Sequence, residues 1–174
     1  MTGTCLLESV PRGTLDMSVL LELNRLVVPA TNPYRGLFRS GSGSIRLDGK
    51  IHCELLPPAE AWRIAQEAID CMNDAVLSGV ALSRPVETAA QAVLRTTTAH
   101  VFVDGNGRVA RAAGNWLLTR SGYQLVDDPK RFCRERIHGY YEALRRAEDG
   151  DPTAWDNFFA ALVGECYRSA ASVI

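Results

Sequence analysis

The sequence predicts an all-α fold, a bundle of helices that carries one small β-hairpin. After residue 57 most of the chain repeats apolar side chains every three to four residues, as amphipathic helices do. Residues 43–56 instead alternate apolar and polar side chains around an Asp-Gly pair, which is typical of a hairpin. The 174 residues fit one domain, 1–174, with a core at about 16–168.

The first expected element is a short amphipathic helix at 16–27. Its sequence, DMSVLLELNRLV, places four apolar side chains at helical spacing. The Pro and Gly of NPYRGLF, residues 32–38, then interrupt the pattern. We therefore expect an irregular connection between this helix and the hairpin.

The hairpin is expected in GSIRLDGKIHCELLPP, which begins at residue 43. Asp48-Gly49 is the strongest short turn signal, and apolar residues alternate on both sides of it. Pro57-Pro58 ends the pattern. Since an isolated hairpin is only marginally stable in water, this one must lie against the rest of the chain.

Helices are expected from there to the C-terminus. The last two begin with Asp-Pro, which suits Asp as the N-cap and Pro as the first helical residue. Gly79 and Gly122 are plausible helix ends. The five expected helices cover 58–79, 84–102, 107–122, 128–150 and 151–174.

The composition argues against several classes of partner. The net charge is −1 with no basic stripe, so we expect neither a nucleic acid nor a membrane surface as a partner. The five cysteines are widely spaced, which favours buried free thiols over disulfides or a zinc cluster. The N-terminus does not resemble a secretory signal, so we expect a cytoplasmic protein, with delivery into a host cell left open.

One stretch, HVFVDGNGRVAR at 100–111, gathers more polar groups at a helix junction than folding requires. His100 is its one titratable base near neutral pH. Asp104 offers a hard oxygen ligand of the kind that Mg²⁺ takes together with substrate phosphates. A tight Gly-Asn-Gly turn follows, at which the backbone can approach a ligand closely. The stretch therefore suggests chemistry on a phosphate compound.

The helix that follows this turn adds a phosphate-binding end. Its first N–H groups have no partner within the helix and its dipole is positive there. Arg108 and Arg111 are three residues apart, so they share one face and could clamp a di- or triphosphate. Each feature alone has an ordinary explanation: a capping histidine, a turn, a solvated pair of arginines. Their order and spacing together favour a site.

The stretch resembles the signature of the Fic domain family, His-x-Phe-x-[Asp/Glu]-Gly-Asn-Gly-Arg-x-x-Arg, at every fixed position. Val101 stands where the family most often has Pro. GLFR at 36–39 resembles the segment before the family's flap, and the hairpin lies where that flap lies. LLTRSGYQL resembles the family's Gly-Tyr exit from the motif helix. The resemblance runs from about residue 16 to the C-terminus and implies a Fic-type helical bundle with a flap over the active site.

The resemblance implies a protein adenylyltransferase, which moves AMP from ATP to a Ser, Thr or Tyr hydroxyl of a target protein and releases pyrophosphate. His100 would be the catalytic base and Asp104 the ligand of Mg²⁺. Phe102 would point into the core and fix the loop. Because such a transfer is in-line attack at phosphorus, the protein mainly positions groups and offsets charge.

The remaining motif residues would hold the nucleotide, by the same resemblance. Asn106 would bind the α-phosphate, and the backbone of Gly105 and Gly107 would complete an anion hole. Arg108 would hold the β-phosphate region and Arg111 the γ-phosphate.

The flap would dock the target protein. An extended target segment would pair with the hairpin by β-augmentation and so align its hydroxyl. The expected docking residues are Ile45, Arg46, Leu47 and Ile51.

Other activities stay open. The Doc branch of the family phosphorylates its target and has Lys where this chain has Gly107, which favours nucleotidyl transfer here. UMP or phosphocholine transfer also fits the motif. A scaffold without chemistry is disfavoured by the presence of His100 and Asp104. His52 and His138 are interpreted as surface or packing residues.

Regulation is left open by the sequence. Many Fic proteins carry an inhibitory [Ser/Thr]-x-x-x-Glu-[Gly/Asn] helix whose Glu pairs with the second motif arginine. Thr4 with Glu8, and Ser18 with Glu22, fit this pattern only in part. Either a separate antitoxin-like partner supplies a Glu to Arg111, which would make this chain a toxin, or the enzyme is constitutively active.

Overall fold

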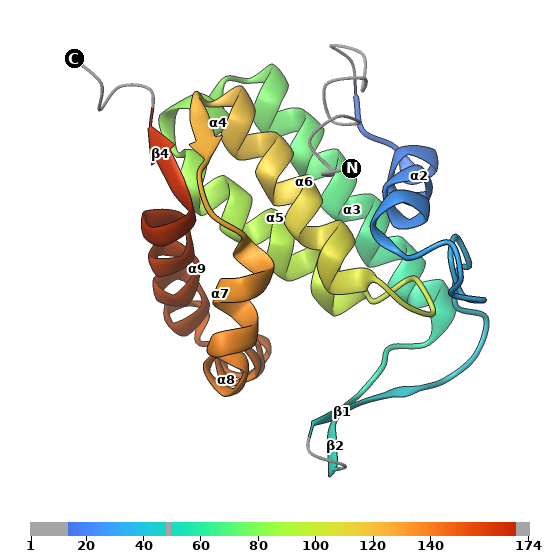
Figure 1. Ribbon diagram of the computed structural model, residues 1–174. Helices are drawn as coiled ribbons and strands as arrows, with labels where there is room; N and C mark the ends of the chain where they lie inside the picture. Colours follow the sequence, from blue (N-terminus) through green and yellow to red (C-terminus); the bar gives the residue numbers. More distant parts are fainter. Residues whose placement is uncertain (1–13, 48–49, 170–174) are drawn as a thin grey trace.

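The computed structural model describes residues 14–47 and 50–169 (Figure 1). In these ranges the helices are α2 (Met17–Val27), α3 (Pro58–Leu77), α4 (Val80–Ser83), α5 (Pro85–Ala99), α6 (Asn106–Arg120), α7 (Pro129–Glu135), α8 (Ile137–Glu148) and α9 (Pro152–Cys166). The strands are β1 (Ser44–Leu47), β2 (Lys50–Glu54), β3 (Tyr123–Leu125) and β4 (Tyr167–Ser169). The predicted helical bundle with a hairpin is confirmed.

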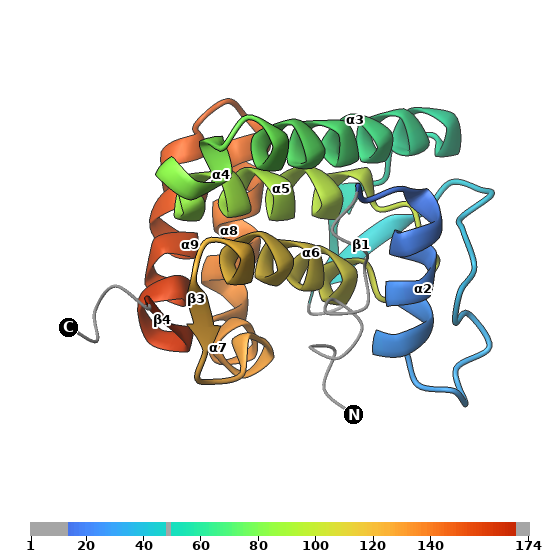
Figure 2. The same ribbon diagram turned by 90° about the horizontal axis from the view of Figure 1, so that it is seen from above.

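Helix α5 lies at the centre of the bundle. It packs between α3 and α6 and also contacts α9, and Figure 2 shows α3, α5 and α6 as successive layers. Small buried side chains, such as Ala89 in α5 and Ala113 in α6, let these helices approach closely. A Cβ added at Gly114 of α6 would lie 2.5 Å from Cγ2 of Val93. The close α5–α6 contact fixes the junction between these two helices.

The helix ends follow the predicted signals. The side chains of Asp128 and Asp151 accept hydrogen bonds from the N–H groups of Lys130 and Thr153, so both act as N-caps in front of a proline. Gly79 and Gly122 take left-handed φ angles of 76° and 83° just beyond the ends of α3 and α6. These end predictions are confirmed.

The predicted helix at 128–150 is wrong in one respect, because it is broken into α7 and α8 at Arg136. The break turns the chain so that both pieces pack on α9. The ring of Phe132 lies 5.4 Å from that of Phe158, and the ring of Tyr140 lies 5.7 Å from the same Phe158 ring. The Arg136 guanidinium covers Phe132 at 4.1 Å and pairs with Glu165. A single straight helix could not make these contacts.

Two predicted helices are also too long. The one expected at 84–102 ends at Ala99, because His100 leaves the helix with a φ of 49°. The one expected at 151–174 ends at Cys166, where Tyr167 is buried and strand β4 pairs antiparallel with β3. Periodicity did not distinguish this short strand from the last turn of a helix.

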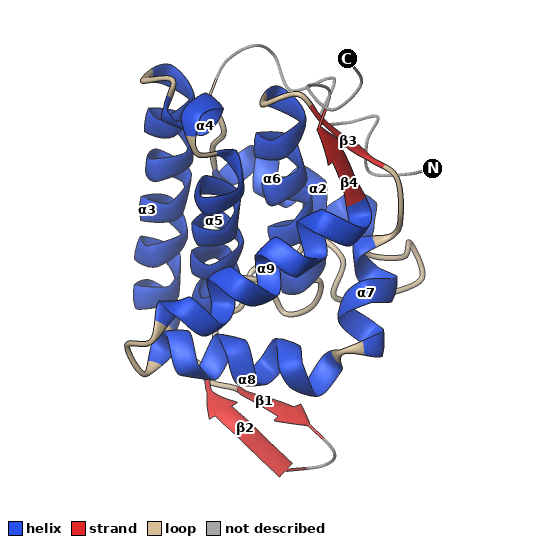
Figure 3. Cartoon of the chain, turned by 90° about the vertical axis from the view of Figure 1, so that its left-hand side faces the viewer, coloured by secondary structure: helices blue, strands red, loops and turns tan. Residues whose placement is uncertain are grey.

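The hairpin stands away from the bundle beside α8 (Figure 3). Strands β1 and β2 are antiparallel, from Ser44 opposite Glu54 to Leu47 opposite Lys50, with a register shift between Ile45 and Arg46. Its predicted strands are confirmed, whereas the Asp-Gly turn lies outside the described residues.

The cysteine prediction is partly right. Cys133 and Cys166 are buried free thiols, but Cys53 is half-buried and Cys71 is exposed. Cys5 lies outside the described residues. None of the helices described here is long and apolar enough to cross a membrane.

Candidate active site

The junction between α5 and α6 is closed by the side chain of Asn106. Its Oδ1 accepts a hydrogen bond from the N–H of Phe102 at 2.9 Å, and its Nδ2 donates to the carbonyl of Phe102 at 2.8 Å. Asn106 is 4% exposed, so these bonds are shielded from water. Its amide keeps one N–H for a ligand.

Phe102 holds the loop to the core, as its predicted role requires. It is 1% exposed and its ring stacks on Phe38, with 4.9 Å between centroids. The two residues also form an antiparallel bridge. The N–H of Arg39 donates to the carbonyl of Val101, so the segment before the flap lies along the motif loop.

Arg39 ties the hairpin to the motif. Its guanidinium donates to the carbonyl of His100 at 3.1 Å and to those of Gly41 and Leu56, each at 2.7 Å. One side chain therefore joins the segments on both sides of the hairpin to the backbone of His100. The sequence analysis gave Arg39 no role, although it is the Arg of the GLFR segment.

His100 is a neutral base in this setting. Burial lowers its pKa, and the nearby charge of Arg39 lowers it further, against smaller opposing effects of the Thr97 carbonyl and Asp104. The Nδ1 atom of His100 is buried and makes no hydrogen bond to a described residue. The Thr97 backbone lies close enough to raise the pKa of the ring, but this effect is smaller than those of burial and Arg39. Proton exchange with a ligand therefore falls to Nε2.

Asp104 is held in place by three donors. Its Oδ1 accepts from the N–H of Gly105 at 2.6 Å, and its Oδ2 from Asn32 at 2.7 Å and Arg108 at 3.0 Å. Burial alone would raise the pKa of this carboxyl, but these hydrogen bonds hold it below its usual range. The side chain is 40% exposed, and Oδ1 keeps a free lone pair. The carboxylate is therefore charged, fixed and accessible, so it could serve as an oxygen ligand of a metal ion.

The two motif arginines differ in their surroundings. Arg108 donates to the carbonyl of Val27 at 2.8 Å and pairs with Asp104, so its guanidinium is committed to protein groups. Arg111 lies close enough to Cys133 to offset part of the rise that burial causes in the pKa of that thiol, and it pairs with no carboxylate among the described residues. Of the two, Arg111 has more capacity left for an anion.

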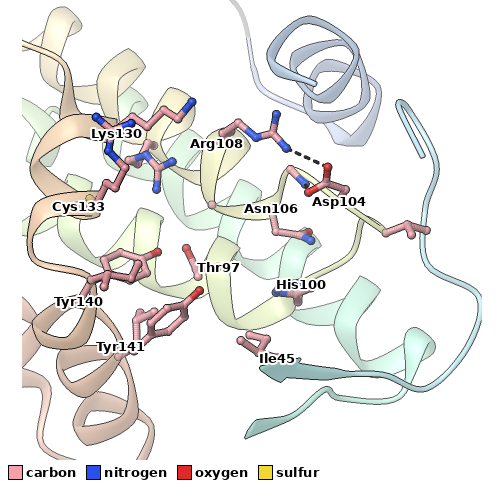
Figure 4. Close-up of a pocket in the computed structure, with 17 residues that line it drawn as sticks. Ile45, Thr97, His100, Asp104, Asn106, Arg108, Lys130, Cys133, Tyr140 and Tyr141 are labelled. Atoms are coloured by element: carbon pink, nitrogen blue, oxygen red, sulfur yellow. Dashed lines mark hydrogen bonds and ion pairs between the residues drawn. The ribbon is translucent and has the colours of Figure 1, made fainter. Parts of the chain in front are cut away.

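A pocket of about 380 Å³ opens over the motif (Figure 4). One wall is the predicted set of His100, Asp104, Gly105, Asn106, Gly107, Arg108 and Arg111. The structure thus brings together all the predicted catalytic, metal and nucleotide residues. The volume of the pocket lies in the range of small-molecule sites.

The other wall comes from α5, α7 and α8 and was missed by the sequence analysis. Spacing within α7 could have shown that Lys130 and Arg134 share a face, but not that this face meets the motif. The missed lining residues include Thr97, Lys130, Cys133, Arg134, Ile137, Tyr140, Tyr141 and Leu144.

The predicted flap residues are only partly gathered at the pocket. Ile45 lines it, whereas Arg46 is exposed and is not part of its lining. Leu47 and Ile51 lie in the paired strands, and their side chains lie outside the described part of the structure.

Comparison with known proteins identifies the family of the chain. Residues 14–118 match the Fic/DOC family, and this range covers more than half of the chain and includes the whole motif. The chain belongs to the Fic/DOC family. The Fic resemblance predicted from the motif is therefore confirmed.

Named Fic relatives extend the similarity beyond the motif. Protein adenylyltransferase Fic of Drosophila virilis is 41% identical over 153 residues, which are 87% of this chain and 29% of that protein. Protein adenylyltransferase Fic of Drosophila willistoni is 32% identical over 153 residues, or 28% of its length. The chain thus spans less than a third of the length of these curated relatives.

Solved Fic structures share the fold. A Fic domain containing signaling protein from Bacteroides thetaiotaomicron superposes with a TM-score of 0.72 at 25% identity, covering 93% of this chain and 65% of that one. The BepC effector of Bartonella tribocorum, solved with bound AMPPNP, gives a TM-score of 0.69 at 16% identity, covering 96% and 81%.

Proposed function

We propose that this chain transfers AMP from ATP to a hydroxyl group of a target protein and releases pyrophosphate. The observation that carries the proposal is that one pocket is lined by a neutral His100, by Arg111 and by the N-terminal residues of α6. Relatives named protein adenylyltransferase, and a structure of the same fold with an ATP analogue, support the choice of reaction.

The reaction needs one proton transfer and one displacement. Nε2 of His100 accepts the proton of the target hydroxyl, whose oxygen attacks the α-phosphorus while the bond to the bridging oxygen of the β-phosphate breaks. The pyrophosphate leaves with the bonding electron pair. The N–H groups of Asn106 and Gly107, which begin α6, and the guanidinium of Arg111 offset its charge.

The site fits Mg²⁺ as a companion of the nucleotide. Asp104 is fixed and keeps one lone pair, and no cluster of three or more acidic, His or Cys ligands occurs in the described residues. Mg²⁺ typically takes one or two carboxylates together with phosphates and waters, so a single carboxylate suffices. When bound, the ion would neutralise phosphate charge.

The apolar end of the pocket suits the nucleoside. Ile137, Tyr141 and Leu144 line this part, with Ile45 of the hairpin beside them. With the phosphates at the motif, the base would pack among these side chains. Among these side chains only the Tyr141 hydroxyl can form hydrogen bonds, and a hydroxyl both donates and accepts, so it does not by itself select adenine. Other donors, such as UTP or CDP-choline, are therefore further substrates to test.

Phosphoryl transfer of the Doc type is the main alternative. A Cβ at Gly107 would lie 3.3 Å from Nη1 of Arg111, so a side chain there would crowd the free arginine. The absence of a side chain favours a triphosphate that extends along α6 to Arg111. This supports nucleotidyl transfer over kinase activity.

The hairpin would dock the target, with Ile45, Arg46, Leu47 and Ile51 as the predicted contacts. Antiparallel strands in a projecting hairpin offer backbone groups to an added strand. The hairpin leads through Arg39 to the backbone of His100, so a docked segment would lie near the base.

Inhibition by a partner that supplies a Glu to Arg111 is the regulation we favour. Glu22 of the partial inhibitory pattern pairs with Arg25, and Ser18 hydrogen-bonds Asp16, so this pair is engaged locally. Thr4 and Glu8 lie outside the described residues. A toxin role, and the cytoplasm as its place of action, stay predictions.

The test is transfer of label from α-³²P-ATP with Mg²⁺ in a cell lysate, beside the His100→Ala variant. A labelled protein band that the variant does not produce would support the proposal. Labelling from γ-³²P-ATP alone would instead indicate a kinase. Label that persists at wild-type level in His100→Ala would contradict the assignment of the base.

A further inference from the structure

Helix α7 carries two cations on the pocket wall that faces the motif. Lys130 and Arg134 are four residues apart, so they share one face of the helix, and both line the pocket. Figure 4 shows the Lys130 side chain extending from α7 toward Arg108. The pocket thus has positive side chains on two facing elements.

These two cations have no acidic partner in the described part of the chain. Their neighbour Arg131, on the same helix, pairs with both Asp127 and Glu135. Lys130 and Arg134 form no such ion pair with any described residue, although each is exposed enough to reach one. Within the described residues, therefore, the arginine of α7 that does not line the pocket is paired with carboxylates, whereas the two cations that line it are not.

The charge lining the pocket is strongly unbalanced. Among the described residues that line it, the cations are Arg108, Arg111, Lys130 and Arg134, and the one carboxylate is Asp104, which pairs with Arg108. A wall with this excess of positive charge favours a polyanion over a single carboxylate or phosphate.

We infer that Lys130 and Arg134 bind the terminal phosphates of the donor and the pyrophosphate that leaves. The inference rests on the proposed function. The α-phosphate has to lie beside His100, and Figure 4 places Lys130 at the opposite end of the pocket. Cys133, between the two cations in sequence, lines the same pocket as Arg111 and is close enough to feel its charge, so α7 meets the motif where a γ-phosphate would lie.

Helix α7 is then the second half of the phosphate site. The motif holds the nucleotide from the α6 side, and the α7 cations close over the far end. Because charge builds up on the leaving pyrophosphate, cations there stabilise the transition state as well as the bound donor. The specificity for a triphosphate comes from both helices.

The experiment compares equilibrium binding of ATP, AMP and pyrophosphate to the wild type and to the Lys130→Gln, Arg134→Gln double variant. We expect the double variant to bind ATP and pyrophosphate roughly tenfold more weakly, and AMP within about twofold of the wild type. Arg131→Gln is the matched control, since it removes an arginine of α7 that does not line the pocket. It should leave all three affinities unchanged.

Two results would overturn the inference: unchanged binding of pyrophosphate in the double variant, or an equal loss for AMP and ATP. Labelling with α-³²P-ATP separates this inference from the proposed function. If the wild type labels a target and the double variant binds pyrophosphate normally, the inference fails and the function stands. If the double variant loses pyrophosphate binding but the wild type labels nothing, the anion site stands and the transfer proposal fails.

Discussion

The guanidinium of Arg39 donates a hydrogen bond from Nε to the backbone carbonyl of His100 over 3.1 Å. The same side chain lies close enough to the imidazole for its charge to lower the pKa of His100. Arg39 also holds Gly41 and Leu56, on either side of the hairpin. One residue therefore links the position of the flap to the protonation of the candidate base.

Replacing Arg39 by Gln should raise the pKa of His100. Removing a nearby positive charge makes the imidazolium less costly, so the value should move toward the usual one of about 6.5. Titration of the histidine ring signals by NMR measures the shift, with His100→Gln used to assign the resonance. Arg39→Lys is the control, since it keeps the charge and should shift the pKa less. A fall in the pKa of Arg39→Gln would contradict the electrostatic link.

The transfer activity should persist below pH 6.5, because His100 stays unprotonated there. Since burial and Arg39 lower the pKa of His100, its neutral form persists into more acidic solution than that of an exposed histidine. We expect kcat/KM to fall about tenfold per pH unit only below the lowered pKa. In Arg39→Gln the fall should begin at higher pH. An acid limb at or above pH 6.5 in the wild type would contradict the assignment.

The free energy of unfolding should also decrease as the pH falls below the usual pKa of histidine. Between its lowered folded pKa and its unfolded value, His100 binds more protons in the unfolded chain, so the free energy of unfolding falls as the pH drops through this window. Urea unfolding at several pH values measures the slope. The slope should be shallower in His100→Gln, and an identical slope would show that other groups account for it.

Replacing Asp104 by Asn should weaken the Mg²⁺ dependence of nucleotide binding. The neutral amide can still accept from Gly105, but it loses the charge that attracts the ion and the ion pair with Arg108. We expect the variant in Mg²⁺ to bind ATP as the wild type does in EDTA. Isothermal titration in both conditions measures this. A variant that keeps the wild-type response to Mg²⁺ would exclude Asp104 as the ligand.

Much of the bundle could be predicted because its helix ends are marked locally. Asp128 and Asp151 stand before prolines and cap their helices, and Gly79 and Gly122 provide left-handed ends. The break at Arg136 has no such mark. It depends on how Phe132 packs against α9, and this is a tertiary contact that periodicity does not encode.

The site was predictable on one side of the pocket only. The motif residues lie next to one another in the sequence, so their spacing carries their geometry. Lys130, Arg134 and Tyr141 reach the pocket because α7 and α8 turn back toward α6, and no local pattern shows that approach. The two hydrogen bonds from the Asn106 side chain to the backbone of Phe102 were not predictable for another reason. The sequence does not show whether an asparagine side chain binds a phosphate or closes a loop.

The close contact between α5 and α6 predicts that Gly114→Ala destabilises the fold, whereas Gly164→Ala, in α9, does not. A Cβ at Gly114 would lie 2.5 Å from Cγ2 of Val93, and also near the Phe159 ring, so Gly114→Ala forces these helices apart. Overpacking costs about 1–3 kcal/mol, against a gain of about 1 kcal/mol in helix propensity, so we expect a net loss of up to about 2 kcal/mol. Outside its own helix backbone, no described atom lies within 4 Å of a Cβ added at Gly164 in α9, so Gly164→Ala should leave stability unchanged or raise it by up to about 1 kcal/mol. Urea unfolding of both variants measures the difference, and equal stabilities would show that α5 and α6 separate without cost.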